Sequence, residues 1–99
     1  MYEELNDCVF ETKKYGECWF DVAWYGNKRV ALQVLNAEGP ITVITVNLPD
    51  SPLAENEMFI KTWEGNGDIL PDVLATGLFT DTGKKAAGLV KAPIWVIND

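Results

Sequence analysis

Large apolar residues occupy every second position from Cys18 to Trp24, and the same alternation returns from Val30 to Val34. Successive side chains of a β-strand point to opposite faces, so each run predicts a strand with one buried face. Gly26 and Asn27 lie between the two runs and are typical turn residues. The sequence therefore predicts a β-hairpin here.

The buried face also selects the register of this hairpin. A two-residue turn would pair Val22 with Ala31 and divide the apolar residues between both faces. A three-residue loop, Gly26 to Lys28, keeps them together and pairs Trp24 with Val30, Val22 with Leu32 and Phe20 with Val34. Because a slip of one residue moves every side chain to the other face, we expect this second register.

The same reasoning applies to the next turn. A three-residue loop, Ala37 to Gly39, places glycine where a left-handed backbone is needed. It pairs Val34 with Thr42, Leu32 with Ile44 and Val30 with Val46. The result is an antiparallel meander over about 18–47, and its core face holds Phe20, Val22, Trp24, Val30, Leu32, Val34, Ile44 and Val46.

A second apolar cluster lies on the opposite face of this meander: Trp19, Leu35, Ile41 and Val43. It is either covered by other elements of the fold or forms a contact surface, and we expect it to be covered.

The remaining chain predicts shorter elements. Residues 1–16 are polar and suit a short helix or an irregular arm. Pro49 and Pro52 end the sheet, and residues 58–63 form a fourth strand or a helical turn. A helix is predicted over about 69–76, with Asp68 as N-cap and Gly77 as the residue after its end; Pro71 is tolerated in the first turn.

Ile94 to Ile97 predict a terminal strand, and Pro93 places it at a sheet edge. The predicted fold class is α+β, a single domain over 1–99 with an antiparallel sheet of four to five strands and one short helix.

The chain is acidic, with 15 Asp and Glu against 8 Lys and Arg and a net charge of −7. Such a surface repels phosphates and anionic lipid, which argues against nucleic acid or membrane as a direct partner. It suits docking on a basic groove of another protein, although solubility alone also explains it. The sequence shows neither a signal peptide nor about 20 consecutive apolar residues, so we expect a cytoplasmic protein.

Histidine is absent from the sequence. This excludes Ser-His-Asp and Cys-His nucleophile systems and His-ligated zinc sites, so we expect no enzyme, no metal and no cofactor. Carboxylate, lysine or tyrosine chemistry is the remaining enzymatic alternative. Cys8 and Cys18 are expected as reduced thiols rather than as a disulfide, with Cys18 in the core.

Acidic residues gather between Asp50 and Asp72, against the single basic residue Lys61. This segment predicts an anionic patch for a basic partner, with Trp63 as an aromatic anchor. Its alternative is a solvated loop. The candidate partner-binding residues are Asp50, Glu55, Glu57, Trp63, Glu64 and Asp68.

Other motifs are weaker. Glu64 to Asp68 has oxygen ligands but lacks the spacing of a calcium loop, and Gly65-Asn66-Gly67 lacks the lysine of a phosphate-binding loop. Lys84, Lys85 and Lys91 form a small basic cluster in a glycine-containing segment and are expected to be solvated. Trp19, like Trp63, is a candidate for a partner surface.

Several motifs together resemble a known family. They are Val46-Asn47-Leu48-Pro49-Asp50, Pro52-Leu53, Glu55-Asn56-Glu57, Lys61-Thr62-Trp63, Ile69-Leu70, Thr82-Gly83, Gly88-Leu89-Val90 and Ala92-Pro93. Over approximately residues 29–97 the chain resembles the bacterial family called domain of unknown function 4313, which is found on plasmids, phages and other mobile elements. The resemblance implies no chemistry, since the family has no established activity.

The leading hypothesis is therefore a mobile-element protein that binds and inhibits a host protein, for which an anti-CRISPR or other anti-defence role is the natural form. One alternative is a module that binds a small molecule or a nucleotide signal. Another is a plasmid or phage accessory protein without an inhibitory role.

Overall fold

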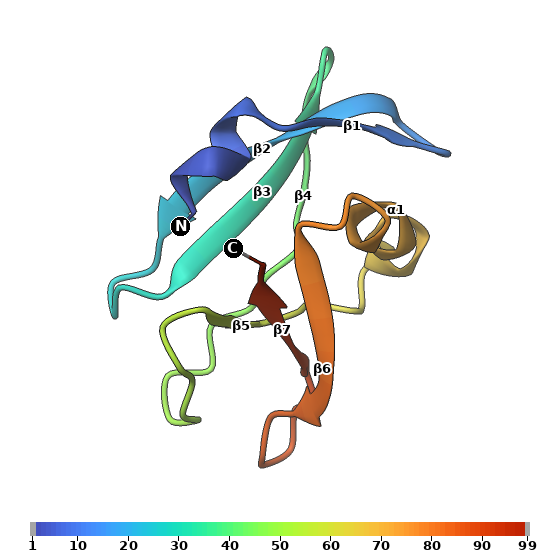
Figure 1. The fold of residues 1–99 in the computed structure, drawn as a ribbon. Helices are drawn as coiled ribbons and strands as arrows, with labels where there is room; N and C mark the ends of the chain where they lie inside the picture. The colour runs from blue at the N-terminus through green and yellow to red at the C-terminus, as the bar shows by residue number, and fades with distance from the viewer. Residues whose placement is uncertain (1, 99) are drawn as a thin grey trace.

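The computed structural model describes residues 2–98, which fold as α+β with two antiparallel sheets (Figure 1). One sheet has four strands in the order β1-β2-β3-β4, and the other has three in the order β5-β7-β6. The α+β class is confirmed; the second sheet was not expected. The elements are η1 Glu3–Asp7, β1 Val9–Thr12, β2 Gly16–Trp24, β3 Val30–Asn36, β4 Gly39–Val43, β5 Glu57–Phe59, η2 Asn66–Asp68, α1 Leu70–Leu74, β6 Phe79–Lys85 and β7 Pro93–Ile97, where η denotes a 3₁₀-helix.

The predicted register of the first hairpin is confirmed. Strand β2 pairs with β3 through Trp24 and Val30, Val22 and Leu32, and Phe20 and Val34. Tyr25 and Arg29 close the three-residue loop with a 2.8 Å backbone hydrogen bond. Lys28 takes the left-handed conformation in this loop, with φ +69°.

The second turn was predicted with the wrong loop, and its predicted pairing is correct only in part: β4 ends at Val43, and the Val46 N–H donates to the Phe59 carbonyl instead of pairing with Val30. Asn36 pairs with Gly39, so the loop has two residues rather than three. A β-bulge then restores the pairing of Val34 with Thr42. The extra residue lies within the strand instead of in the turn because a bulge absorbs one residue while keeping the buried face in register.

The N-terminal segment contains a short helix, one of the two alternatives expected, and also a strand that was not expected. Residues 3–7 form the 3₁₀-helix η1, whose Leu5 is buried, and residues 9–12 form the edge strand β1. The helix η1 precedes β1 in the chain and also lies beside β2, where the Val22 N–H donates to Asn6 Oδ1 at 3.4 Å.

The second sheet corrects two predictions. Strand β7 lies between β5 and β6, so it is central and not at an edge. Pro93 is tolerated because it is the first residue of the strand, where a missing N–H costs least. Lys84 and Lys85 belong to β6, a strand that the sequence did not predict because its residues are mostly polar and exposed.

The predicted helix is present but short. It covers Leu70–Leu74, with Pro71 in its first turn. Asp68 was wrongly predicted as its N-cap: it lies in η2, and Ile69 holds the cap position without a side-chain hydrogen bond. Gly77 has φ +77° and donates its N–H to the Leu74 carbonyl, which ends the helical turn.

One core joins the two sheets. The Phe20 ring stacks on Phe10 of the same sheet at 4.8 Å and meets Phe79 of the second sheet edge-on at 5.8 Å. Buried Leu5 and Val73 bring η1 and α1 into the same cluster, and Cys18 is fully buried there. Cys8 and Cys18 are free thiols.

Trp24 corrects the predicted core face, because its side chain is 54% exposed. It is the last residue of β2, beside the turn, where the sheet extends beyond the elements that cover it. The Tyr2 ring meets Trp24 edge-on at 5.5 Å.

Candidate protein-binding surface

The predicted partner-binding residues fall into separate places. Glu55 and Glu57 line one cleft, whereas exposed Asp50 lines a different, shallow recess. Trp63, Glu64 and Asp68 lie around η2 and line neither. The structure therefore divides the six residues among three places rather than forming one patch.

Glu57 has a structural role. Its carboxylate accepts hydrogen bonds from the Ala54 N–H at 2.9 Å and from Lys84 Nζ at 2.6 Å. These bonds lower the pKa of Glu57, the backbone bond most. A lowered pKa is the opposite of what a general acid needs, so this residue does not suit carboxylate-based acid catalysis.

Two other acids of the segment are paired as well. Glu64 contacts Lys61 at 2.8 Å, and Asp68 contacts Lys14 at 3.1 Å. Trp63 is 40% exposed. Since half of the six candidate residues are acids engaged within the chain, their charge is partly neutralised.

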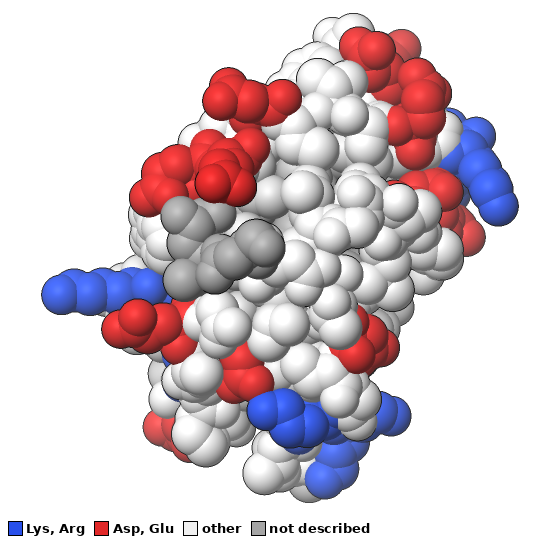
Figure 2. All heavy atoms as spheres, in the orientation of Figure 1, with Lys and Arg blue, Asp and Glu red and all other residues white. Residues whose placement is uncertain are grey.

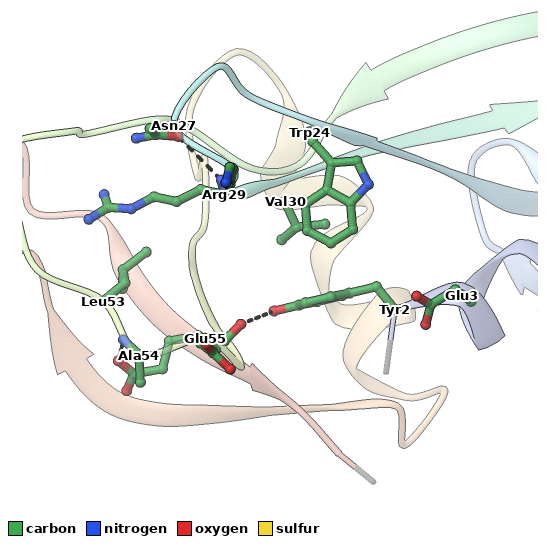
Figure 3. A pocket seen from close by; sticks show the side chains of 11 residues that line it. Tyr2, Glu3, Trp24, Asn27, Arg29, Val30, Leu53, Ala54 and Glu55 are labelled. Atoms are coloured by element: carbon green, nitrogen blue, oxygen red, sulfur yellow. Dashed lines mark hydrogen bonds between the residues drawn. The ribbon is translucent and has the colours of Figure 1, made fainter.

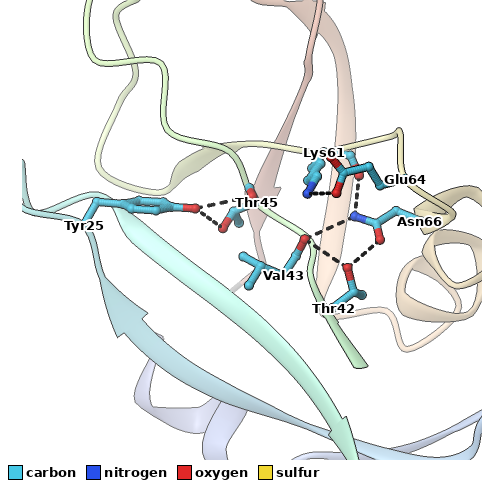
Figure 4. A network of polar contacts seen from close by, with 7 residues as sticks. All are labelled: Tyr25, Thr42, Val43, Thr45, Lys61, Glu64 and Asn66. Carbon is cyan, nitrogen blue, oxygen red and sulfur yellow. Dashed lines mark hydrogen bonds and ion pairs between the residues drawn. The ribbon is translucent and has the colours of Figure 1, made fainter. Parts of the chain in front are cut away.

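Asn66 organises this region, although the sequence suggested only a weak ligand loop there. Its side chain is buried, accepts a hydrogen bond from Thr42 Oγ1 at 2.7 Å and donates to the carbonyls of Val43 and Lys61 (Figure 4). The loop therefore binds the end of β4 rather than an ion or a phosphate.

The cleft lined by Glu55 and Glu57 has a volume of about 460 Å³ and lies between the β2–β3 turn and residues 53–57. Figure 3 shows the rings of Tyr2 and Trp24 on one side of it and the loop with Leu53, Ala54 and Glu55 on the other. The Tyr2 hydroxyl donates to the Glu55 carbonyl at 3.2 Å, and burial raises the pKa of Tyr2 to about 12.

Arg29 also lines this cleft but its guanidinium is used elsewhere. It donates to the carbonyls of Leu48 at 2.7 Å and Ser51 at 2.5 Å, and it lies over the Phe59 ring. Figure 3 shows the side chain directed away from Trp24. Arg29 therefore fixes the loop after β4 and is not available to a ligand in the cleft.

The outward face of the four-stranded sheet carries an apolar row. Val9 pairs with Trp19, Trp19 with Leu35, and Leu35 with Pro40, so the row crosses all four strands. Val9 is 58% exposed, Pro40 is exposed, and Trp19 and Leu35 are half-buried. We call these four residues the outer row.

Other elements were expected to cover this face, and they cover it only in part, since the residues of the predicted cluster are all half-buried. The shared core lies on the opposite face, where Phe20, Leu32 and Val34 are buried. Of the predicted apolar cluster, only Ile41 packs against that core. A sheet buries its second face only if the chain supplies another layer, and the second sheet and α1 contribute to the first core instead.

Acidic side chains border the outer row on both sides. Glu11 and Glu17 pair with each other and lie two residues from Val9 and Trp19, toward the β1–β2 turn. Asp21 lies two residues from Trp19 in the opposite direction along β2. All three are exposed, and none forms an ion pair within residues 2–98. Like charges placed directly opposite each other destabilise a sheet, so the Glu11 and Glu17 pair has a cost in the free chain.

The charges are unevenly distributed over the molecule. In Figure 2, acidic side chains dominate the upper part, and basic side chains gather at the lower end, where the β6–β7 loop lies in Figure 1. The outer row therefore belongs to the acidic part of the surface.

Within residues 2–98, no group of three or more Cys, Asp or Glu side chains could hold a metal ion. Over the same range, no helix has the length and apolar character to cross a membrane.

Comparison with family models, with curated proteins and with solved structures gave no match to this chain. The sequence indicated Trp19 and Leu35 as a possible contact cluster but missed Val9, because β1 was not predicted. A pairing of residues 9–12 with 16–19 across the turn at Lys13 to Tyr15 would have revealed it.

Proposed function

We propose that this chain works by binding another protein through the outer row, and that the partner presents a basic surface. The observation that carries the proposal is a partly exposed apolar row bordered on both sides by acids without ion pairs. An apolar centre with a charged border is the arrangement of specific protein interfaces.

Each part of the surface has a distinct role in the proposal. Trp19 lies at the middle of the row, and tryptophan is the residue type most enriched among binding hot spots. The row crosses four strands, a length of about 14 Å at the usual strand spacing. Glu11, Glu17 and Asp21 would speed association with a basic partner and relieve their own repulsion in the complex.

The biological role remains the one suggested by the sequence resemblance: a mobile-element protein that inhibits a host protein, including a host defence protein. Binding without catalysis is part of the proposal. Asp50 and Glu55, which form no ion pair within residues 2–98, stay candidate contacts for a partner. Glu57 is less suitable because its carboxylate is already engaged.

The test compares two double charge reversals in a pull-down from host lysate. Glu11→Lys with Glu17→Lys changes the acidic border, and Glu4→Lys with Asp81→Lys is the control at exposed positions outside the candidate contacts. Each reversal adds two charges, so both variants move from −7 to −3. We expect the first variant to lose the captured protein, with at least about tenfold weaker affinity, and the control to retain it.

Two results would contradict the proposal. One is a wild-type chain that captures no protein in a stoichiometric amount. The other is equal loss of the partner in both variants, since a general effect of net charge would then suffice. Higher salt should act chiefly on the association rate, because distant charges are screened.

The cleft favours a second candidate, a module for a small molecule. Its volume and the half-exposed Trp24 ring suit a ligand with a flat apolar group. A metabolite panel that raises the melting temperature of the wild type, but not of Trp24→Ala, would support this candidate.

A further inference from the structure

The loop that joins β6 to β7 exposes unusually apolar side chains. The Ala86 N–H donates to the Ala92 carbonyl at 2.8 Å and closes the loop. At its tip, Leu89 is 103% exposed and Val90 is 41% exposed. Polar residues and glycine dominate ordinary turns, so two adjacent exposed aliphatic side chains at a tip indicate a contact site.

A recess lies directly beside this tip. Its volume is about 260 Å³, and its walls come from two loops: residues 48–51 on one side, and Ala87, Leu89 and Val90 on the other. Leu48 and Pro49 make the first wall largely apolar. One small patch therefore offers both an apolar projection and an apolar hollow.

The same patch carries both signs of charge. Asp50 lines the recess, and Lys91 directly follows the tip. Both are exposed, and neither forms an ion pair within residues 2–98. Nearby Lys84 differs, because Glu57 already neutralises it.

We propose that a second copy of this chain occupies the patch and forms a two-fold symmetric dimer. In such a dimer the same patch meets itself, so it must contain its own complement. Leu89 of each copy enters the recess of the other beside Leu48, and Lys91 of each copy faces Asp50 of the other. Because only two loops contribute, the dimer is transient and depends on protein concentration.

The dimer uses a different surface from the outer row and leaves that row open on both copies. It joins two partner-binding surfaces, which would strengthen attachment to a partner with repeated sites. The experiment below contains no partner, so its outcome is independent of the proposed function.

Sedimentation velocity of the whole chain, from about 10 µM to about 1 mM, tests the dimer. The average mass of the wild type should rise with concentration toward that of two chains. Leu89→Ser should weaken the dimer at least about tenfold. Because Leu89 is fully exposed, the substitution should not disturb the fold, so misfolding would not account for the loss. Val9→Ser, an exposed apolar residue on the outer row, is the matched control and should behave as the wild type does.

A charge exchange tests the geometry. Asp50→Lys alone and Lys91→Asp alone should each weaken the dimer, because like charges then face each other. Mixing the two variants should restore it, since both contacts of the mixed dimer again join opposite charges. A wild type that stays at the mass of one chain, a dimer insensitive to Leu89→Ser, or a mixture that fails to associate would each overturn the proposal.

Discussion

Tyr2 illustrates how a single side chain connects parts of the chain that are distant in sequence. It is 5% exposed, its ring lies against Trp24, and its hydroxyl donates to the Glu55 carbonyl. Burial disfavours the charged phenolate, and this raises the pKa of Tyr2 from 10.0 to about 12.

Tyr2→Phe should change the pH dependence of stability. In the wild type, the unfolded chain loses the phenol proton near pH 10.0 and the folded chain only near 12. The folded state then binds more protons, so its free energy of unfolding falls as pH rises between these values. Phenylalanine removes this dependence, and at neutral pH it costs about 1 kcal/mol for the lost hydrogen bond.

Urea unfolding at several pH values measures both effects. Tyr15→Phe is the control, since Tyr15 is only half-buried whereas Tyr2 is buried. An alkaline loss of stability that is the same in Tyr2→Phe and in the wild type would show that other groups produce it.

At the scale of elements, apolar alternation determines the pairing of β2 with β3. Residue type alone gave a wrong prediction at the start of the helix. Asp68 has the right type for an N-cap, yet it pairs with Lys14, which is 54 residues away in sequence. Cap preference is worth only about 1 kcal/mol, so a tertiary contact can override it. The second turn shows a similar limit, because a loop of two residues with a bulge and a loop of three residues give the same buried face.

Asn66 joins β4, the loop after β5 and η2 through three side-chain hydrogen bonds. Asn66→Ala should lower the free energy of unfolding by about 2–3 kcal/mol, because the Val43 and Lys61 carbonyls lose a buried donor. Asn98→Ala is the control: Asn98 also makes two hydrogen bonds, but it is exposed and water can replace them.

Denaturant titration of both variants measures the difference. The structural role of Asn66 would be refuted by equal effects in the two variants. Calcium should stabilise neither the wild type nor Asn66→Ala, since the Asn66 oxygen is already occupied by Thr42.

At the scale of the whole molecule, the two sheets depend on one core. Residues of both sheets, η1 and α1 belong to a single cluster of buried side chains, with Phe20 in contact with each sheet. The second sheet has a smaller cluster of its own around Phe59 and Ile94, but its Phe79 and Trp95 belong to the shared cluster. The two sheets should therefore unfold together.

Phe20→Ala tests this dependence. We expect the free energy of unfolding to fall by about 3–4 kcal/mol, as for other large-to-small changes in a core. Backbone circular dichroism and tryptophan fluorescence, with Trp95 reporting on the second sheet, should follow one transition. Two separated transitions would show that the sheets are independently stable.

The sequence by itself determined the class of the fold, the register of β2 with β3 and the burial of Cys18. These follow from a period of two in side-chain direction, which is a local property of the chain. The tertiary structure alone decided which face stays open. The sequence placed apolar residues on both faces of the first sheet, but only the folded chain shows that β5, β6, β7 and α1 contribute to one core. Elements that pack against the core face of this sheet cannot also cover its outer face. Val9 therefore stays exposed and Trp19 half-buried.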